Sequence, residues 1–505
     1  MVITVLLRRL SRLDKIFSLE EANRFIEKNS NKVNNKYRAQ YHVMAPTGWI
    51  NDPNGFVFYK GDYHLFYQYY PYTSEWGPMH WGHVKSKDLI NWEELPVALA
   101  PDQAYDKDGC FSGSAIEYEG KLVLMYTGHV VENDNVIQTQ CLAISDDGVT
   151  FTKVIQNPVI SSNLLGKEGS LSDFRDPKIF KREDTYYSVV ATKTEDSRGK
   201  IVMFKSNDLI EWEFVSNLLE GDSSQGIMWE CPDLFHLDGY DVLIMSPIQI
   251  KKSGLEYHNV SSTMACIGHM DWETGKLEVD NFHEIDFGFD FYAPQTLIDD
   301  KNRRIMIAWM QMWGRTLPTH DLGHNWAGTM TLPRELKVKD GRLIQKPIST
   351  VYAALEYQNG FENIEIKNKP VVFHNVIEDN TYIQFVCDLS QSEVLEIEFA
   401  KGKTQSISLK YNVKTELFTM NRESIGYDIL GEEEQKLVER QVKVPLVNNK
   451  LILEIFRDTS SIELFINAQE TMTATFYEIE KGRDIIFKTS GNALIDSFET
   501  GRVKV

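Results

Sequence analysis

The sequence contains little cysteine. Five cysteines are scattered over 505 residues, and no two of them form a C-x-x-C pair. An odd number of scattered thiols provides neither the disulfide framework of a small secreted protein nor a zinc knuckle. We therefore expect reduced thiols and a cytoplasmic protein.

Long apolar runs and an excess of basic charge are also absent. The apolar stretch in the opening MVITVLLRRLSRL is shorter than the core of a signal peptide, and its basic residues follow it instead of preceding it. The formal net charge is −20, a sign that repels phosphate backbones and anionic lipids. We expect no export signal, no transmembrane span, and neither a nucleic acid nor a membrane as partner.

The residues that are present indicate two all-β domains. A chain of 505 residues exceeds the roughly 250–300 at which a single core stops growing. From about residue 41, short aromatic and β-branched runs alternate with turn residues, which predicts strands. Residues 1–40 form an N-terminal extension, where SLEEANRFIEK at 18–28 predicts a short helix whose capping box is Ser18 with Glu21.

Two phrases recur along the first two thirds of the chain. KSKDLINWE at 85–93 returns as KSNDLIEWE at 205–213, with a looser copy, ISDDGVTFTK, midway between them. A strand, turn, strand phrase occurs five times, with turns near Gly61, Gly120, Asp184, Gly239 and Asn302. A lone four-stranded blade cannot bury both of its faces, so five copies predict a five-bladed β-propeller, which we assign to 41–340.

The repeat ends after PREL at 333–336. Alternating strands such as VLEIEFA, SISLKYN, LILEIFRD and SIELFINA then continue to the end of the chain. This pattern predicts a β-sandwich of two packed sheets over 350–505, with the boundary near residue 345.

Three of the repeats carry an acid just upstream of the hairpin turn. Asp52 in WINDPNG precedes Gly61 by nine residues, Asp176 in FRDPK precedes Asp184 by eight, and Glu230 in WECPD precedes Gly239 by nine. The acids thus occupy nearly the same position in an inner strand, and inner strands line a propeller's axis. We expect three carboxylates to converge on one pocket, although Asp52 and Asp176 could instead cap turns.

Converging carboxylates suit the hydrolysis of a glycosidic bond. Burial and mutual repulsion raise at least one pKa, which keeps one carboxyl protonated near neutral pH. One group then protonates the leaving oxygen while the other attacks, or activates a water, depending on the gap between them. No cofactor or metal is expected, because His80 and His83 lack further ligands at zinc spacing. We place these two histidines at the mouth of the pocket.

The motifs together resemble a known family. WINDPNG at 49–55, FSGS at 111–114, FRDP at 174–177, ECP at 230–232 and FYA at 291–293 stand in the order found in glycoside hydrolase family 32, the family of invertases, fructan hydrolases and sucrose-6-phosphate hydrolases. Ile50 stands where many members have Met, a volume-conserving apolar change. The C-terminal phrase LILEIFRDTSSIELFINAQETMTATFY resembles this family's β-sandwich.

The resemblance implies a role for each site residue. Asp52 would be the nucleophile of a retaining β-fructofuranosidase, Glu230 the general acid/base, and Asp176 the transition-state stabiliser. Arg175 would pair with a carboxylate. The remaining residues predicted to hold or cover the sugar are Asn51, Gln68, Trp76, Phe111, Ser112, Tyr292 and Trp313. Cys231, beside the acid, is more often a small buried hydrophobe than a catalytic group.

The substrate remains open at this point. We expect sucrose, sucrose-6-phosphate or a short fructo-oligosaccharide, and the sandwich would serve packing or contact between subunits of a homo-oligomer. Two alternatives use the same pocket. A lectin-like propeller would bind sugar without turnover, and a transfructosylase would pass the fructosyl group to another sugar instead of to water.

Overall fold

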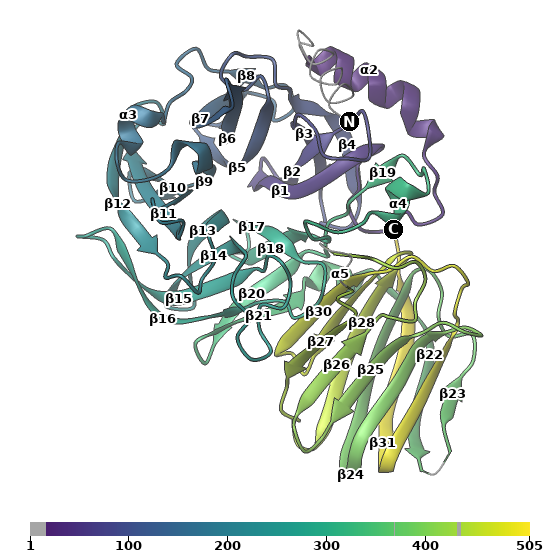
Figure 1. The fold of residues 1–505 in the computed structure, drawn as a ribbon. Coiled ribbons are helices and arrows are strands. Elements are labelled where there is room, and N and C mark those ends of the chain that lie inside the picture. Colours follow the sequence, from purple (N-terminus) through teal and green to yellow (C-terminus); the bar gives the residue numbers. More distant parts are fainter. Residues whose placement is uncertain (1–16, 368, 432–435) are drawn as a thin grey trace.

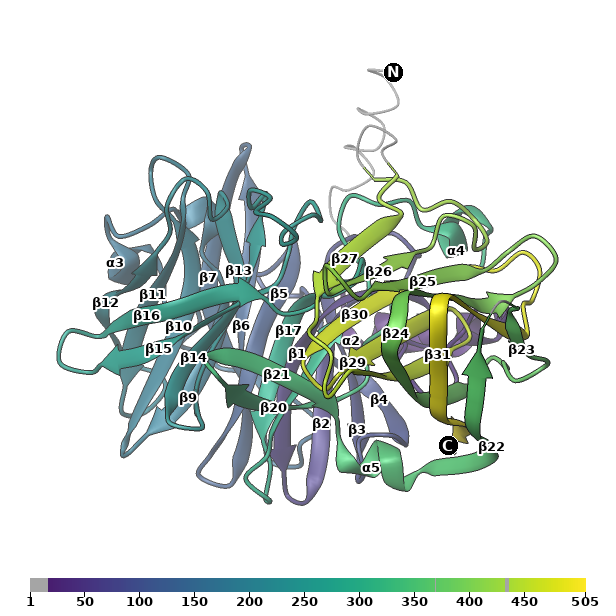
Figure 2. The same cartoon turned by 90° about the horizontal axis from the view of Figure 1, so that it is seen from below.

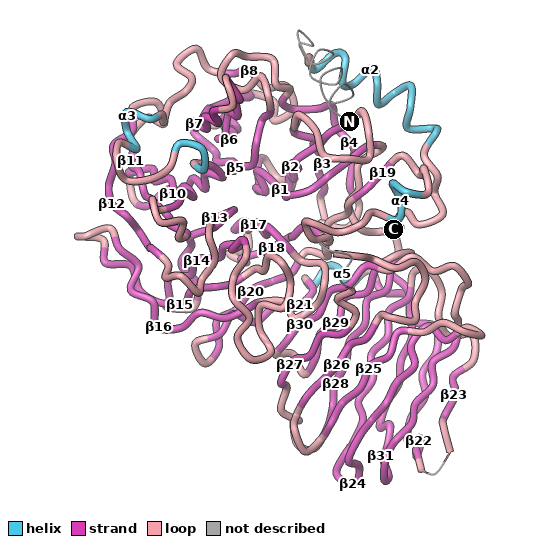
Figure 3. The backbone as a smooth tube through the Cα atoms, viewed as in Figure 1, coloured by secondary structure: helices cyan, strands magenta, loops and turns pink. Residues whose placement is uncertain are grey.

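The computed structural model describes residues 17–367, 369–431 and 436–505. Strands dominate it, and the few helices are short (Figure 3). Five small sheets surround a central axis, and a larger β-structure lies beside them (Figures 1 and 2). The predicted all-β fold, a five-bladed propeller followed by a β-sandwich, is confirmed. The opening residues 1–16, including the stretch judged not to be an export signal, lie outside the described residues.

The helices are peripheral. Helix α2 (Leu19–Asn29) begins where the sequence predicts, with the Ser18 side chain accepting a hydrogen bond from the amide of Glu21 at 3.2 Å. It contacts the first blade through Asn23, whose side chain accepts from the amide of Val97. The remaining helices are α3 (Ser162–Leu165), α4 (Pro318–Asp321), α5 (Ser349–Ala353), and the 3-10 turns η1 (Ser30–Lys32) and η2 (Leu171–Asp173). No described helix is long and apolar enough to cross a membrane.

Each blade is a four-stranded antiparallel meander. The inner strands are β1 (Gly48–Tyr59), β5 (Gly109–Tyr118), β9 (Arg175–Arg182), β13 (Met228–Leu237) and β17 (Tyr292–Ile298). The second strands are β2 (Asp62–Tyr70), β6 (Lys121–Glu132), β10 (Thr185–Lys193), β14 (Tyr240–Ile248) and β18 (Arg304–Trp309). The third strands are β3 (His80–Ser86), β7 (Asn135–Ser145), β11 (Gly199–Ser206), β15 (Met264–Asp271) and β20 (Arg334–Lys339). The outer strands are β4 (Trp92–Leu99), β8 (Thr152–Lys153), β12 (Trp212–Glu220), β16 (Lys276–Glu284) and β21 (Arg342–Pro347).

The ring is closed by the chain itself. Strand β19 (Trp326–Ala327), which follows β18 of the fifth blade, pairs in parallel with β1 of the first blade. The predicted turns lie between the first and second strands, and Gly61, Gly120 and Gly239 have φ between 78° and 88°. Glycine tolerates this left-handed conformation without steric cost.

The repeated serine phrase forms the link between the third and fourth strands of three blades. The hydroxyls of Ser86, Ser145 and Ser206 each accept a hydrogen bond from the amide three residues later, at 2.8–2.9 Å. The phrase therefore recurs because the same turn starts each outer strand.

The C-terminal structure has two layers that share two long strands, β24 (Thr381–Lys401) and β31 (Asp484–Val503). The first half of β24 pairs with β28 and its second half with β25, and register shifts lie between the halves. One layer is completed by β22 (Leu355–Ile366), β28 (Lys450–Asp458), β29 (Ser461–Ile466) and β30 (Glu470–Thr475). The other is completed by β23 (Val371–Phe373), β25 (Ile407–Asn412), β26 (Leu417–Asn421) and β27 (Glu439–Lys443).

Candidate active site

The inner strands share one irregularity that sets the geometry of the site. Every inner strand shifts register against its neighbour near its start, as a β-bulge does. Bulges re-aim side chains and are frequent beside active sites. The residues at these bulges include Asp52, Ser112, Asp176, Cys231 and Ala293. Bulge residues from four blades, Ser112, Asp176, Cys231 and Pro294, line a single cavity.

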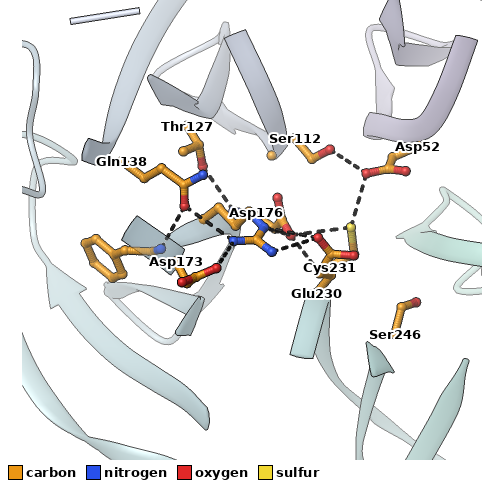
Figure 4. A network of polar contacts seen from close by, with 12 residues as sticks. Asp52, Ser112, Thr127, Gln138, Asp173, Asp176, Glu230, Cys231 and Ser246 are labelled. Atoms are coloured by element: carbon orange, nitrogen blue, oxygen red, sulfur yellow. Dashed lines mark hydrogen bonds and ion pairs between the residues drawn. The ribbon is translucent and has the colours of Figure 1, made fainter. Parts of the chain in front are cut away.

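The three acids do not stand in strictly equivalent positions. Aligned on the proline that follows, Asp52 and Asp176 correspond to Cys231, and Glu230 stands one residue earlier. The nine-residue spacing of Asp52 misleads because β1 has a second register shift, between Asn54 and Val57, that adds a residue before the turn. The side chain of Glu230 nevertheless joins those of Asp52 and Asp176 in one polar network (Figure 4).

Asp52 receives donors from three directions. Its Oδ1 accepts from Asn51 Nδ2 at 3.1 Å, and its Oδ2 accepts from Ser112 Oγ at 2.8 Å and from Cys231 Sγ at 3.5 Å. Burial raises the pKa of Asp52, and the charge of Glu230 raises it further, while the three donors act in the opposite direction. The donors fix the orientation of a buried carboxylate.

Glu230 is held by a cation and a phenol. Its Oε1 accepts from Arg175 Nη2 at 2.9 Å and Nε at 3.1 Å, and its Oε2 accepts from Tyr292 Oη at 2.6 Å. Arg175 is anchored in turn by Asp173, whose Oδ1 accepts from Nη1 at 3.1 Å. The two carboxyl oxygens of Glu230 thus have different partners.

Asp176 is the third acid. Its Oδ2 accepts from the amide of Cys231 at 3.0 Å, with the thiol Sγ at 3.7 Å. Burial raises the pKa of Asp176 to about 7; the guanidinium of Arg175 lowers it, and the charges of Glu230 and Asp52 raise it. The sequence predicts that at least one of the three carboxyl pKa values is raised, and burial raises the pKa of both Asp52 and Asp176. Asp176 has φ 63°, a left-handed conformation that is uncommon outside glycine.

The other predicted sugar contacts differ in their surroundings. Trp313 stacks on Trp49, with ring centroids 5.8 Å apart, and Trp49 Nε1 donates to Asn51 Oδ1 at 2.7 Å. Trp76 is 47% exposed and meets the ring of Phe111 edge-on. Gln68 is buried, and its amide donates to the carbonyl of Cys110. Four of the predicted residues contact the acids directly: Asn51, Ser112, Arg175 and Tyr292. The contacts described for the other four, Gln68, Trp76, Phe111 and Trp313, are with residues other than the acids.

One prediction about the pocket is wrong. His80 and His83 are completely buried and do not lie at its mouth. His83 Nε2 lies 3.0 Å from His64 Nδ1, and its ring stacks on Phe66 at 3.9 Å. The rings of His83 and Phe66 pack between the first and second blades, where both meet Phe151 edge-on. The ring of His80 packs against those of Phe17 and Tyr72. Among the residues that the structure describes, no group of three or more His, Cys, Asp and Glu is arranged to hold a metal ion.

Sequence reasoning undervalued several residues around the acids. The thiol of Cys231 lies between Asp52 and Asp176, and burial raises its pKa well above the ordinary value, so it is a neutral donor. Gln138 Oε1 accepts from the amide of Phe174, and Thr127 Oγ1 accepts from the amide of Asp176 (Figure 4). For Cys231, its position next to Glu230 in the sequence was a signal. For Gln138 and Thr127 the sequence offered none.

Comparisons with known proteins identify relatives of this chain. The family model "Glycosyl hydrolases family 32 N-terminal domain" matches residues 42–347, and "Glycosyl hydrolases family 32 C terminal" matches 352–502. A sucrose-6-phosphate hydrolase of Zymomonas mobilis is 36% identical over 91% of each chain. A GH32 beta-fructofuranosidase of Bombyx mori is 34% identical with TM-score 0.82, and covers 96% of this chain and 98% of its own. The sucrose-6-phosphate hydrolase of Lactobacillus gasseri is 27% identical with TM-score 0.85, and covers 97% and 99%. The prediction of a glycoside hydrolase is confirmed, and the chain belongs to glycosyl hydrolase family 32.

Proposed function

We propose that this chain is a retaining β-fructofuranosidase that hydrolyses sucrose, sucrose-6-phosphate or short fructo-oligosaccharides through a covalent fructosyl-enzyme intermediate. The observation that carries the proposal is the meeting of Asp52, Asp176 and Glu230 on the propeller axis, each with a different set of partners. The relatives named sucrose-6-phosphate hydrolase and beta-fructofuranosidase support the substrate class.

In this mechanism Asp52 attacks the anomeric carbon of the fructosyl unit. The bond to the leaving oxygen breaks as Glu230 donates its proton to that oxygen. Glu230, now ionised, removes a proton from water, and the water oxygen attacks the same carbon and releases Asp52. Asn51 and Ser112 orient the attacking carboxylate, while Arg175 and Tyr292 orient Glu230.

Asp176 would bind hydroxyls of the fructosyl ring. Positive charge develops on the sugar ring as the leaving group departs, so a nearby carboxylate stabilises the transition state more than the ground state. Trp76 and Phe111 would offer aromatic faces to the sugar, and Gln68 and Trp313 would shape the fructosyl subsite. The division of the chain into 1–40, 41–340 and 350–505 belongs to this proposal. The start of β22 at Leu355 supports a sandwich from about residue 350, but β21 of the fifth blade ends at Pro347, so the propeller would extend past residue 340. Cytoplasmic location and a homo-oligomer stay predictions.

The test compares initial rates of fructose release from sucrose, sucrose-6-phosphate, kestose and inulin. Comparable kcat/KM on long inulin would contradict the substrate range. Asp52→Asn should abolish turnover without unfolding the protein, and Asp146→Asn, the same change at an exposed site, should leave it intact. An active Asp52→Asn variant would refute the mechanism.

Two alternatives make different predictions in the same assays. A chain that binds sucrose but releases no fructose at any acidic or neutral pH would be a sugar-binding propeller. A chain that at high sucrose yields fructosylated sugars in place of free fructose would be a transfructosylase.

A further inference from the structure

The loop from Met310 to Leu317, between β18 and α4, packs beside the site through a cluster that contains Trp49, Tyr292 and Trp313. It carries Trp313, whose ring stacks on Trp49 and lies 4.9 Å from that of Trp309. Trp49 donates to Asn51, and Asn51 donates to Asp52. One ring contact and two hydrogen bonds therefore connect this loop to the proposed nucleophile, Asp52.

Arg315 anchors the far end of the loop. Its side chain is only 5% exposed, and Nη1 donates to Asp290 Oδ1 at 2.8 Å and to the carbonyl of Phe289 at 2.7 Å. Nη2 donates to Asn259 Oδ1 at 2.8 Å. Burial lowers the pKa of Arg315 to about 10, and Asp290 opposes this decrease. A planar guanidinium with three fixed acceptors holds the backbone more rigidly than a flexible ammonium could.

The acceptor Asp290 is also held by the β-sandwich. Its Oδ2 accepts from Arg422 Nη1 at 2.5 Å, and from the amide and hydroxyl of Thr475 at 2.8 and 3.0 Å. One buried carboxylate thus binds the loop through Oδ1 and two sandwich residues through Oδ2. Movement of the sandwich would displace the anchor of Arg315.

A second link to the sandwich is direct. The amide of Thr316 donates to the carbonyl of Leu430 at 2.8 Å, and the amide of Leu430 donates back to Thr316 Oγ1 at 2.9 Å. Leu430 belongs to the sandwich segment that follows β26. Two neighbouring loop residues are therefore linked to the second domain by separate contacts, Arg315 through Asp290 and Thr316 directly.

Building on the proposed function, we propose that Arg315 and Thr316 are positioning residues that make the β-sandwich part of the active-site wall, by holding the Trp313 loop against Trp49. Neither residue is required to touch the reacting atoms. Their loss should weaken the fructosyl subsite first, because the loop carries Trp313, which is proposed to shape that subsite. The alternative is an ordinary domain interface whose contacts affect stability alone.

The experiment uses the full chain with two variants and a matched control. Thr316→Val keeps the shape of the side chain and removes one acceptor, and Arg315→Lys keeps the charge and removes the fork. Glu470→Gln breaks the ion pair with Arg342, at 3.0 Å, which also joins propeller and sandwich but involves no residue of the loop. Sucrose kinetics, urea unfolding and amide hydrogen exchange of residues 310–317 are measured for each.

We expect Thr316→Val to raise KM for sucrose about 3-fold with kcat within about 2-fold of wild type, as loss of one neutral hydrogen bond predicts. Arg315→Lys should lower kcat/KM about 10–100-fold through misplacement of the loop. Both variants should exchange the loop amides faster than wild type. For Glu470→Gln, KM and loop exchange should stay at wild-type values, because this variant changes no contact of the loop.

Wild-type KM in Thr316→Val would overturn the proposal, as would an equal rise of KM in Glu470→Gln. Thr316→Val removes only one exposed hydrogen bond, so it decides the matter even if Arg315→Lys does not fold. A wild-type chain that does not hydrolyse sucrose would instead refute the proposed function. Hydrogen exchange alone would then decide whether the two residues anchor the loop.

Discussion

His42 provides the sharpest test of how the two domains are held together. Its ring is fully buried between two sandwich carboxylates, with Nδ1 2.8 Å from Asp458 Oδ2 and Nε2 2.8 Å from Glu463 Oε1. Only an imidazolium can donate from both nitrogens. Glu463 also accepts from Arg334 of the propeller, so the histidine belongs to a charged network across the interface.

The size of the effect follows from the pKa of His42. Burial lowers this pKa, but the two carboxylates outweigh burial and raise it from 6.5 to about 9. A folded pKa above the unfolded one stabilises the protein fully below about pH 6.5, and the stabilisation disappears as pH rises through about 9. The difference corresponds to about 3 kcal/mol in the free energy of unfolding.

The assay is urea unfolding of wild type and His42→Gln at several values between about pH 6 and pH 9.5. The variant should be less stable by about 3 kcal/mol at the acidic end, and the difference should shrink toward the alkaline end. His374→Gln is the control, because His374 forms an exposed ion pair with Asp484 and should change stability by less than about 0.5 kcal/mol. A difference for His42→Gln that stays constant with pH would refute the reasoning.

Three further variants test the site and the interface. Asp176→Asn should lose nearly all turnover yet stabilise the fold, because burial raises the pKa of Asp176 from 3.8 to about 7. The gain in the free energy of unfolding should grow from about pH 4 to 7 and reach the order of 4 kcal/mol, and a gain without pH dependence would contradict it. Tyr292→Phe removes a hydrogen bond to Glu230 and should lower kcat/KM about 10–100-fold with an unchanged urea midpoint; full activity would contradict the role given to Tyr292. Gly288→Ala would place a Cβ 2.1 Å from the backbone of Thr473 and should cost about 1–3 kcal/mol in urea unfolding, whereas wild-type stability would show that the domains can shift apart freely.

The repeat made the propeller predictable. Each blade contains a recognisable hairpin turn, and three blades also contain a link capped by serine. Local sequence patterns therefore predict the number and order of the blades. The converging acids followed from the same register. The off-by-one position of Glu230 did not, because the second bulge in β1 depends on pairing with β2 and leaves no clear mark in the sequence.

Contacts between distant segments were beyond sequence reasoning. His42 meets Asp458 and Glu463 across more than four hundred residues, and no local pattern distinguishes these charges from solvated ones. The same holds for Arg315 and its buried acceptor Asp290. The prediction for His83 was wrong because a histidine beside a predicted pocket suggests a polar lining residue. Its ring instead pairs with His64 and packs against Phe151 between the first two blades.

The stereochemistry of fructosyl transfer to methanol tests the central claim most directly. Displacement by Asp52 followed by attack of methanol on the intermediate inverts the anomeric carbon twice, so sucrose in aqueous methanol should yield methyl β-fructofuranoside as the first product. Proton and carbon NMR spectra of the early reaction mixture distinguish the two anomers. Methyl α-fructofuranoside as the first product would mean a single displacement, and would contradict Asp52 as a nucleophile.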